Sequence, residues 1–347
     1  MPTPSSLVLL LGSAVAWAYE SDQLTSRLTA IDDGDLLADP HADELLLRAA
    51  VRANAQGACS APTPALKEQL AALVHREMGG VVLVPGHGDQ PRMSFGAYAA
   101  WLESGPVPRH SHADRGDLYG QVPVRENLLL SVVGPASTVR LGGVLLGTDK
   151  IDHFWVQGYD YYQRSHAGLD PARAVEWGTS TEWGIWGVRT TGIFSYSDLA
   201  ANHAGFRFYD ALLSARSPLQ RDEAGCVALA RPFRWADWID WQLDEVLNPS
   251  VYRLSLAEGI REVTMGGGGG PCGQSEPLLT VAEQALLQEA LQARPVYAAE
   301  HAPSRATALT LPDLCPGLLL GDIRAPRRPD ALPRPLRGRT RGGDRAG

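Results

Sequence analysis

The stretch TDKIDHF, residues 148–154, places two aspartates, a lysine and a histidine within seven positions. It follows VRLGGVLLG, residues 139–147, a Val/Leu run broken by glycines that predicts a short strand or hairpin ending in a turn. Thr148 is a residue type that caps helices, and Asp149 in a first helical turn gains from the helix dipole. The stretch therefore predicts a short β hairpin followed directly by a helix.

Three helices are predicted in the middle of the chain, at about 149–164, 170–186 and 198–213, the last with Ser197 as its N-cap. On the first helix, Asp149, His153 and Gln157 recur every four residues and therefore share one face. These helices make the protein mainly α, a helical domain with a short β hairpin before a central three-helix unit.

The third helix carries Asp198, Asn202 and Gly205 on one face. A glycine in an exposed helix interior costs about 1 kcal/mol relative to alanine. The expected reason for Gly205 is therefore the close approach of another helix. If the middle helix turns Glu182 toward the polar faces of its neighbours, the polar side chains of all three helices meet in one cluster.

The order of these residues resembles a known pattern. D-K-x-x-H at residues 149–153, an isolated Glu182, and D-L-x-A-N-x-x-G at residues 198–205 are similar to the VanZ-like and YfiM-type bacterial envelope proteins, over roughly residues 145–213. The resemblance implies a helical protein of the cell envelope whose polar residues converge between helices and whose biochemical activity is not established. Those families are mostly membrane-embedded or membrane-anchored.

Two hypotheses follow for the cluster. In the first it is a structural or ligand-binding network in which every buried polar group has a partner, and this is the hypothesis we favour. In the second it is the site of a metal-dependent or acid/base hydrolase acting on an envelope component. No G-x-S-x-G, P-loop or H-E-x-x-H motif names a reaction, a metal or a cofactor. The candidate residues are His153, Glu182 and Asp198 as catalytic groups, and Asp149, Lys150 and Asn202 as ligand-binding groups.

The N-terminus predicts export. Residues 7–15 are apolar but too few to span a bilayer, and Ala16, Trp17 and Ala18 match the pattern that signal peptidase cleaves. We therefore expect a signal peptide at residues 1–18 and a periplasmic or envelope-associated protein; the alternative is a buried N-terminal helix. No later stretch of the sequence is an uninterrupted apolar run of spanning length.

The four cysteines are widely spaced and form no CxxC metal motif. In an oxidising compartment they are compatible with two disulfides, and three pairings are open. We favour Cys272 with Cys315, because both lie in a glycine- and proline-rich segment that needs a covalent link. Free buried thiols are the alternative.

The rest of the chain is predicted from periodicity and turn residues. Helices are expected at 39–56, 63–79 and 278–293, and loops at 79–94 and 106–123. Within the second loop, His110 and His112 favour a surface loop over a zinc site. Residues 231–252 are expected to hold a helix that ends at Asn248-Pro249 and has a tryptophan stripe packed in the core; a carbohydrate-binding platform is the alternative.

The expected organisation is a signal peptide at 1–18, a helical and loop region at 19–125, a central helical domain at 126–262, a glycine-rich linker at 263–274, a helix and loop segment at 275–322, and a tail at 323–347. The tail holds eight arginines and two aspartates, although the whole chain carries a net charge of -8. Its Arg/Pro/Gly composition predicts disorder. An anionic envelope surface could be its partner, whereas the lack of interleaved aromatic residues argues against nucleic acid.

Signal cleavage makes a direct prediction. If residues 1–18 are removed, the mature protein begins at Tyr19, and N-terminal sequencing of protein recovered from the cell envelope should find that residue first. Recovery of the same material with Met1 intact would contradict the export prediction.

Overall fold

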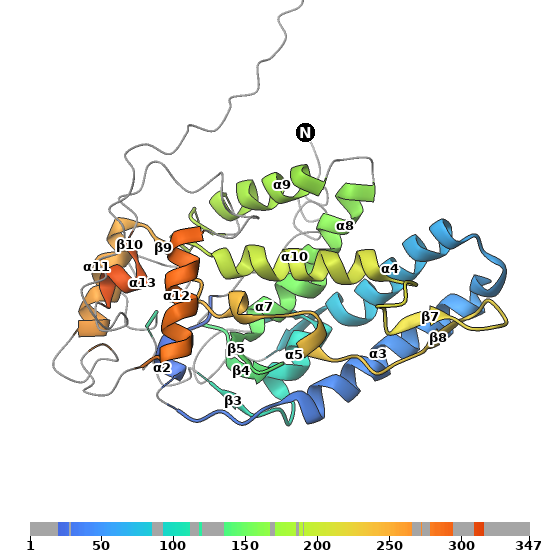
Figure 1. Ribbon diagram of the computed structural model, residues 1–347, viewed down its shortest axis with the longest axis horizontal. Coiled ribbons are helices and arrows are strands. Elements are labelled where there is room, and N and C mark those ends of the chain that lie inside the picture. Colours follow the sequence, from blue (N-terminus) through green and yellow to red (C-terminus); the bar gives the residue numbers. More distant parts are fainter. Residues whose placement is uncertain are drawn as a thin grey trace, which may run out of the picture.

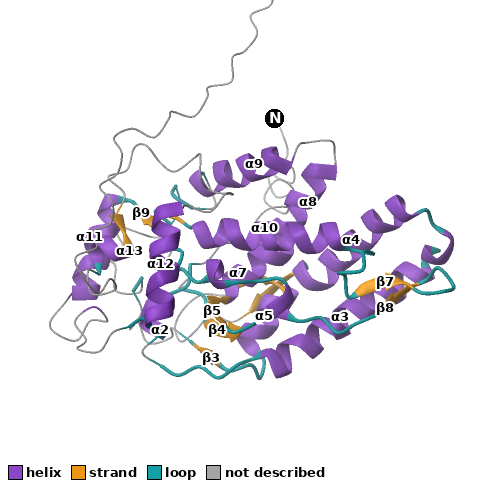
Figure 2. Cartoon of the chain, viewed as in Figure 1, coloured by secondary structure: helices purple, strands orange, loops and turns teal. Residues whose placement is uncertain are grey.

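The computed structural model describes residues 20–27, 29–84, 93–111, 118–119, 135–166, 171–184, 187–189, 191–265, 272, 278–293 and 309–315. The fold is mainly α with small antiparallel sheets, which confirms the predicted class (Figures 1 and 2). The predicted signal peptide and basic tail lie outside these residues, as do residues 266–271 and 273–274 of the predicted glycine-rich linker. The first three residues of that linker, 263–265, are helical instead. None of the helices in the described ranges is long and apolar enough to cross a membrane.

The N-terminal helices confirm the predicted periodicity. The long helices α3 and α4 lie side by side (Figure 1). The predicted loop at 79–94 is wrong in part, because its Val-rich start, residues 81–84, pairs with residues 93–96 as an antiparallel strand. The elements are α2 (Gln23–Ser26), α3 (Asp35–Ala55), the 3-10 turn η1 (Ala58–Ser60), α4 (Thr63–Gly79), β1 (Val81–Val84), β2 (Met93–Gly96) and α5 (Ala97–Ser104).

A three-stranded antiparallel sheet precedes the central helices. Its strands are β3 (Arg109–His110), β4 (Thr138–Leu141) and β5 (Val144–Gly147), in the order β3-β4-β5. The predicted hairpin is β4 and β5, and its two turn residues, Gly142 and Gly143, both have positive φ, as a tight hairpin turn requires. The predicted loop at 106–123 is wrong at His110, which pairs with Thr138 in the sheet. His112 lies outside the described residues.

The first central helix starts where predicted but contains a π-helical turn. It consists of α7 (Thr148–Asp152), the π segment η2 (His153–Gln157) and α8 (Gly158–His166). Thr148 is not the cap: Gly147 holds that position, and the hydroxyl of Thr148 donates instead to the buried carboxylate of Glu103.

The other two central helices are α9 (Pro171–Trp183) and α10 (Tyr196–Ala211). Ser195, and not Ser197, is the N-cap of α10, because its hydroxyl accepts a hydrogen bond from the backbone N–H of Asp198 at 3.1 Å. The helix therefore begins two residues earlier than predicted.

Gly205 has the role that the sequence predicted. A Cβ atom on Gly205 would lie 1.9 Å from the carbonyl oxygen of Phe154 and 3.0 Å from the Cα of Gly158. Helix α10 therefore crosses η2 and α8 backbone to backbone, and the two glycines make this crossing sterically possible.

The tryptophan segment is not the predicted helix. Its tryptophans lie in and beside the 3-10 turns η3 (Trp235–Asp237) and η4 (Trp241–Leu243), and its last two residues are strand β9 (Val251–Tyr252). Carboxylates on α3 bind its backbone instead, since Asp39 accepts from the N–H of Trp235 at 3.1 Å and Asp43 accepts from that of Phe233 at 2.7 Å. Trp235 nevertheless packs in the core as expected, with its ring 5.1 Å from that of Phe154.

The main hydrophobic cluster includes side chains from α3, α4 and α5 together with those of η2 and α10, so apolar packing runs across the boundary proposed at residue 125. A second cluster lies around the C-terminal helices, which Figure 1 shows at one end of the molecule.

The remaining elements are β6 (Ile193–Phe194), β7 (Leu219–Arg221), β8 (Val227–Leu229), β9 (Val251–Tyr252), α11 (Leu254–Met265), α12 (Val281–Ala293), β10 (Leu309–Thr310) and α13 (Leu311–Leu314).

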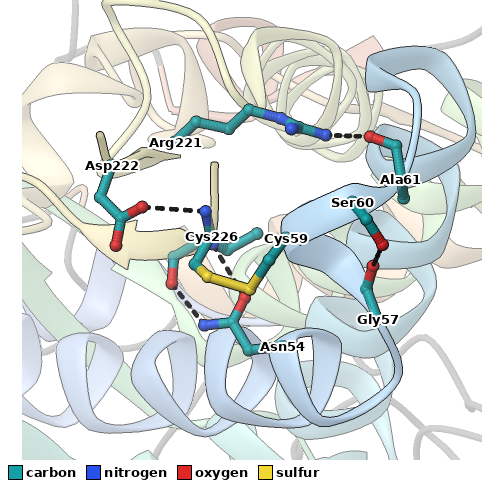
Figure 3. Close-up of a disulfide and its surroundings, with 9 residues drawn as sticks. Asn54, Gly57, Cys59, Ser60, Ala61, Arg221, Asp222 and Cys226 are labelled. Atoms are coloured by element: carbon teal, nitrogen blue, oxygen red, sulfur yellow. Dashed lines mark hydrogen bonds between the residues drawn. A yellow bond between two sulfur atoms is a disulfide. The ribbon is translucent and has the colours of Figure 1, made fainter. Parts of the chain in front are cut away.

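Two disulfides are present. The Cys272–Cys315 pair confirms the pairing that we favoured, and Cys59 pairs with Cys226 across 167 residues of sequence. Figure 3 shows the second disulfide joining the turn after α3 to the β7–β8 hairpin. The amide of Asn54 binds both backbone groups of Val227 at 2.8 Å, so hydrogen bonds reinforce the covalent link.

The glycine crossing predicts a large and specific cost. Gly205→Ala should lower the free energy of unfolding by about 3 kcal/mol, because a methyl group there collides with backbone that cannot move aside. Urea denaturation measures this difference. Gly143→Ala is the control: no atom lies within 4 Å of the added Cβ, and only a positive-φ strain of about 1 kcal/mol is expected. Equal effects of the two substitutions would contradict the close crossing.

Candidate functional site

All six residues predicted for the site meet between the central helices. Asp149 and Lys150 come from α7, His153 from η2, Glu182 from α9, and Asp198 and Asn202 from α10. No side chain among them is more than 4% exposed. His153 and Asp198 are in contact, with Nε2 of the ring 3.2 Å from Oδ2 of the carboxylate. The structure thus brings the predicted set together, while their assigned roles stay predictions.

Lys150 is at the centre of the cluster. Its Nζ atom lies 2.6 Å from Asp149 Oδ2, 2.5 Å from Asp198 Oδ1 and 2.6 Å from Glu245 Oε1. The lysine is fully buried, so its three ammonium hydrogens have these carboxylates as acceptors in place of water. Burial alone would lower the pKa of Lys150, but the surrounding carboxylates raise it well above its ordinary value. Lys150 is therefore a permanent cation and is unsuited to act as a base or nucleophile.

His153 is held from both sides of its ring. Nδ1 lies 2.9 Å from Oδ1 of Asn202, and Nε2 faces the carboxylate of Asp198. Nδ1 is therefore within hydrogen-bonding distance of Asn202, whereas Nε2 lies 3.2 Å from Asp198 without making a hydrogen bond.

The π turn that carries His153 also contacts neighbouring helices through its backbone. The carbonyl oxygen of Trp155 accepts a hydrogen bond from the hydroxyl of Tyr209 at 2.9 Å and lies 3.2 Å from Nδ1 of His75. Groups on α10 and α4 thus bind a carbonyl in the π turn. π turns occur frequently at functional sites.

Sequence reasoning missed three members of the cluster. Glu245 follows η4, Glu20 precedes α2, and Ser195 caps α10. Ser195 donates from its hydroxyl to Asp198 Oδ1 at 2.9 Å, and its backbone N–H donates to Glu182 Oε1 at 2.9 Å. No periodic pattern links Glu20 or Glu245 to the central helices, so only the adjacency of Ser195 to the D-L-x-A-N motif could have indicated a member of this group.

The cluster holds more acidic than basic side chains. Lys150 and His153 face five buried acidic side chains: Glu20, Asp149, Glu182, Asp198 and Glu245. Two sets of three could hold a metal ion, because one oxygen from each member lies within 4.8 Å of the others. These sets are Glu20, Glu182 and Asp198, and Glu20, Asp149 and Glu245.

The buried acidic side chains differ in the direction in which their pKa values are shifted. Burial, followed by the charge of Asp198, raises the pKa values of Glu20 and Glu182 well above their ordinary range. Burial also acts on Asp198, but His153 and Lys150 outweigh it and hold the pKa of Asp198 below its usual value. Asp198 is therefore the carboxylate that stays ionised, while Glu20 and Glu182 need a proton or another cation beside them.

Comparisons with protein-family models, with curated proteins and with solved structures gave no match to the chain. The resemblance to the VanZ-like and YfiM-type proteins therefore stays a prediction carried by its short motifs. The chemistry of the site rests on the geometry described above.

The pKa of Glu245 makes a prediction with a defined sign. Burial raises this pKa to about 7, from an ordinary value of 4.5. The folded protein therefore binds more protons than the unfolded chain between these values. The resulting stabilisation is complete below the lower value and is lost as pH rises through the upper one.

In the presence of a chelator, the free energy of unfolding should thus fall between about pH 5 and about pH 8, and should fall less steeply in Glu245→Gln. Urea denaturation across this range measures both slopes. Glu289→Gln, a change at an exposed position on α12, is the control and should keep the parental slope. A Glu245→Gln slope equal to that of the parent would contradict the raised pKa.

Proposed function

We propose that this chain is an exported, disulfide-bonded protein of the bacterial cell envelope, and that its buried ionic cluster is an internal structural network. The two disulfides support an oxidising compartment, and the motif resemblance supports the envelope. The arginine-rich tail would then contact an anionic envelope surface. The single observation that carries the structural role is the contact of one buried lysine with three carboxylates from separate parts of the chain.

The network joins segments that are far apart in sequence. Lys150 links α7 and α10 to the segment after η4, where Glu245 lies. We call residues 20–26 the N-terminal strap. Glu20 in this strap accepts a hydrogen bond from Thr191 at 3.1 Å, and its backbone carbonyl accepts one from the N–H of Ala136 at 2.9 Å. The cluster therefore holds the strap, the central helices and the segment after η4 in one arrangement.

A second ion-pair set supports the same interpretation. Arg27, which follows the strap, pairs with the buried carboxylate of Asp244 and lies 2.9 Å from Glu283 on α12. Asp22 in the strap accepts backbone hydrogen bonds from Thr25 and Leu118. The strap is thus bound along its length by buried polar contacts, as expected of a structural element.

The hydrolase hypothesis has one supporting contact. His153 beside Asp198 has the composition of an acid/base pair. Both ring nitrogens of His153 already face oxygens, however, and both side chains of the pair are no more than 2% exposed. A polymeric envelope substrate would have no access to the pair in this conformation, so we favour the structural network.

Replacing the central lysine tests the proposal. Lys150→Met keeps the length of the side chain but leaves three buried carboxylates without their cation, and should cost about 3 to 5 kcal/mol in the free energy of unfolding. Lys67→Met is the matched control, because Lys67 pairs with the exposed Asp210 at 2.9 Å. An exposed pair of this kind contributes at most about 1 kcal/mol.

Urea denaturation of both variants at one pH gives the comparison. If Lys150→Met is as stable as Lys67→Met, the cluster is not a structural network, and the hydrolase hypothesis becomes the better account. Hydrogen exchange then adds a spatial check: in Lys150→Met the protection of α7, α10 and the N-terminal strap should fall together.

A further inference from the structure

Two oxygens in the cluster have no hydrogen-bond partner. They are Oε2 of Glu20 and Oδ1 of Asp149, and each belongs to a side chain that is 1% exposed. A buried carboxylate oxygen without a partner loses its hydration and gains nothing in return. The Lys150 network does not explain these atoms, because Lys150 contacts Asp149 through its other oxygen.

The side chains that carry these two oxygens, Glu20 and Asp149, belong to one of the sets that could hold a metal ion. One oxygen each from Glu20, Asp149 and Glu245 lies within 4.8 Å of the other two. A calcium ion binds oxygens at about 2.3 to 2.6 Å, so ligands on its opposite sides are about 5 Å apart. We propose that Glu20, Asp149 and Glu245 form a binding site for one hard divalent cation of the calcium class.

The charges of this set are balanced by such an ion. Three carboxylates carry three negative charges, and Lys150 supplies one positive charge at 2.6 Å from both Asp149 and Glu245. One divalent cation would neutralise the remainder. Asp198 is not a member of this set, and Nε2 of His153 lies 3.2 Å from its carboxylate.

The other set is less suitable. Both oxygens of Asp198 are already engaged, Oδ1 by Lys150 and Ser195 and Oδ2 by His153. Glu182 Oε1 accepts from the backbone N–H of Ser195 at 2.9 Å. A cation bound there would compete with existing partners of both Asp198 and Glu182. Glu20 is common to both sets. In the first set Asp149 adds a second oxygen that has no partner, and the engaged oxygen is Oε1 of Glu245, which Lys150, Ser195 and Ser197 contact.

The donor atoms select the kind of metal. All three ligands are carboxylates, which suit calcium, magnesium or manganese, in contrast to metals that prefer nitrogen or sulfur. The set is buried, which disfavours magnesium because that ion tends to keep several waters. Gly147 keeps the place of Asp149 open: a Cβ atom there would lie 2.1 Å from Asp149 Oδ1 and 1.9 Å from the hydroxyl oxygen of Ser21.

Metal binding to the full-length, oxidised protein tests the proposal. The protein is treated with a chelator, desalted, and titrated with Ca²⁺, Mg²⁺ and Mn²⁺ by calorimetry, and elemental analysis after gel filtration counts the ion retained. We expect one Ca²⁺ per chain, a melting temperature that rises with Ca²⁺ concentration, and Mg²⁺ binding weaker than Ca²⁺ binding.

Three substitutions locate the ion. Glu20→Gln and Asp149→Asn should weaken Ca²⁺ binding by more than about tenfold, while Glu182→Gln should leave it within about twofold, since it belongs only to the other set. Asp152→Asn is the matched control: Asp152 is also buried on α7, and its Oδ1 accepts from the N–H of Gly96 at 2.7 Å, a bond that an amide oxygen also makes. Far-UV circular dichroism shows which variants are folded.

Three results of these binding measurements would overturn the cation site or its choice of ligands. Absence of bound ion in the parent protein at millimolar Ca²⁺, Mg²⁺ and Mn²⁺ overturns the site, whether or not the variants fold. Undiminished Ca²⁺ binding by the Glu20→Gln variant overturns the site as well. If Ca²⁺ binding is lost in Glu182→Gln but retained in Asp149→Asn, the choice of ligands is overturned. The stability of Lys150→Met is measured without metal, so failure of the cation site leaves the test of the structural network unchanged.

Discussion

The ammonium group of Lys150, fully buried among three carboxylates, is the constraint on which the surrounding structure depends. Removing a charge from water costs several kcal/mol, and attraction to neighbouring ions offsets this only when the geometry is close. The three contacts, at 2.5 to 2.6 Å, supply such geometry. Because their carboxylates come from α7, α10 and the segment after η4, these parts must be positioned within a few tenths of an ångström for the lysine to be tolerated.

Short side chains can satisfy that requirement only if the helices approach closely. Asp198 has a single methylene group between its carboxylate and its backbone, so α10 must cross the first central helix near van der Waals contact. The pair Gly158 and Gly205 permits this crossing, and the π turn places His153 against α10 while Tyr209 binds the carbonyl of Trp155. The glycines, the π turn and the ionic contacts therefore depend on one another, and a change in any one of them disturbs the others.

The limits of the sequence analysis follow from the range of the interactions. The long helices and the hairpin before Thr148 were predictable, because periodicity and turn residues act within a few positions. The meeting of Asp149, His153 and Asp198 was predictable from faces on neighbouring helices. Glu20 and Glu245 were not, since each reaches the cluster through tertiary packing. The helix predicted for the tryptophan segment was wrong for the same reason: carboxylates of α3 bind the backbone of this segment and replace the hydrogen bonds of the expected helix.

The cluster has two parts that differ in how completely their charges are balanced. Around Lys150 the ammonium group faces three carboxylates, and Asp198, which His153 also contacts, has a lowered pKa and stays ionised, so this part is fixed. Around Glu20 the negative charge is in excess, and burial makes ionised carboxylates costly unless a proton or a cation accompanies them. A fixed lysine network beside an unbalanced acidic group is an arrangement in which structure and ligand binding coexist. The lysine holds the elements in register, and that rigidity keeps the oxygens of Glu20 and Asp149 close together despite their mutual repulsion.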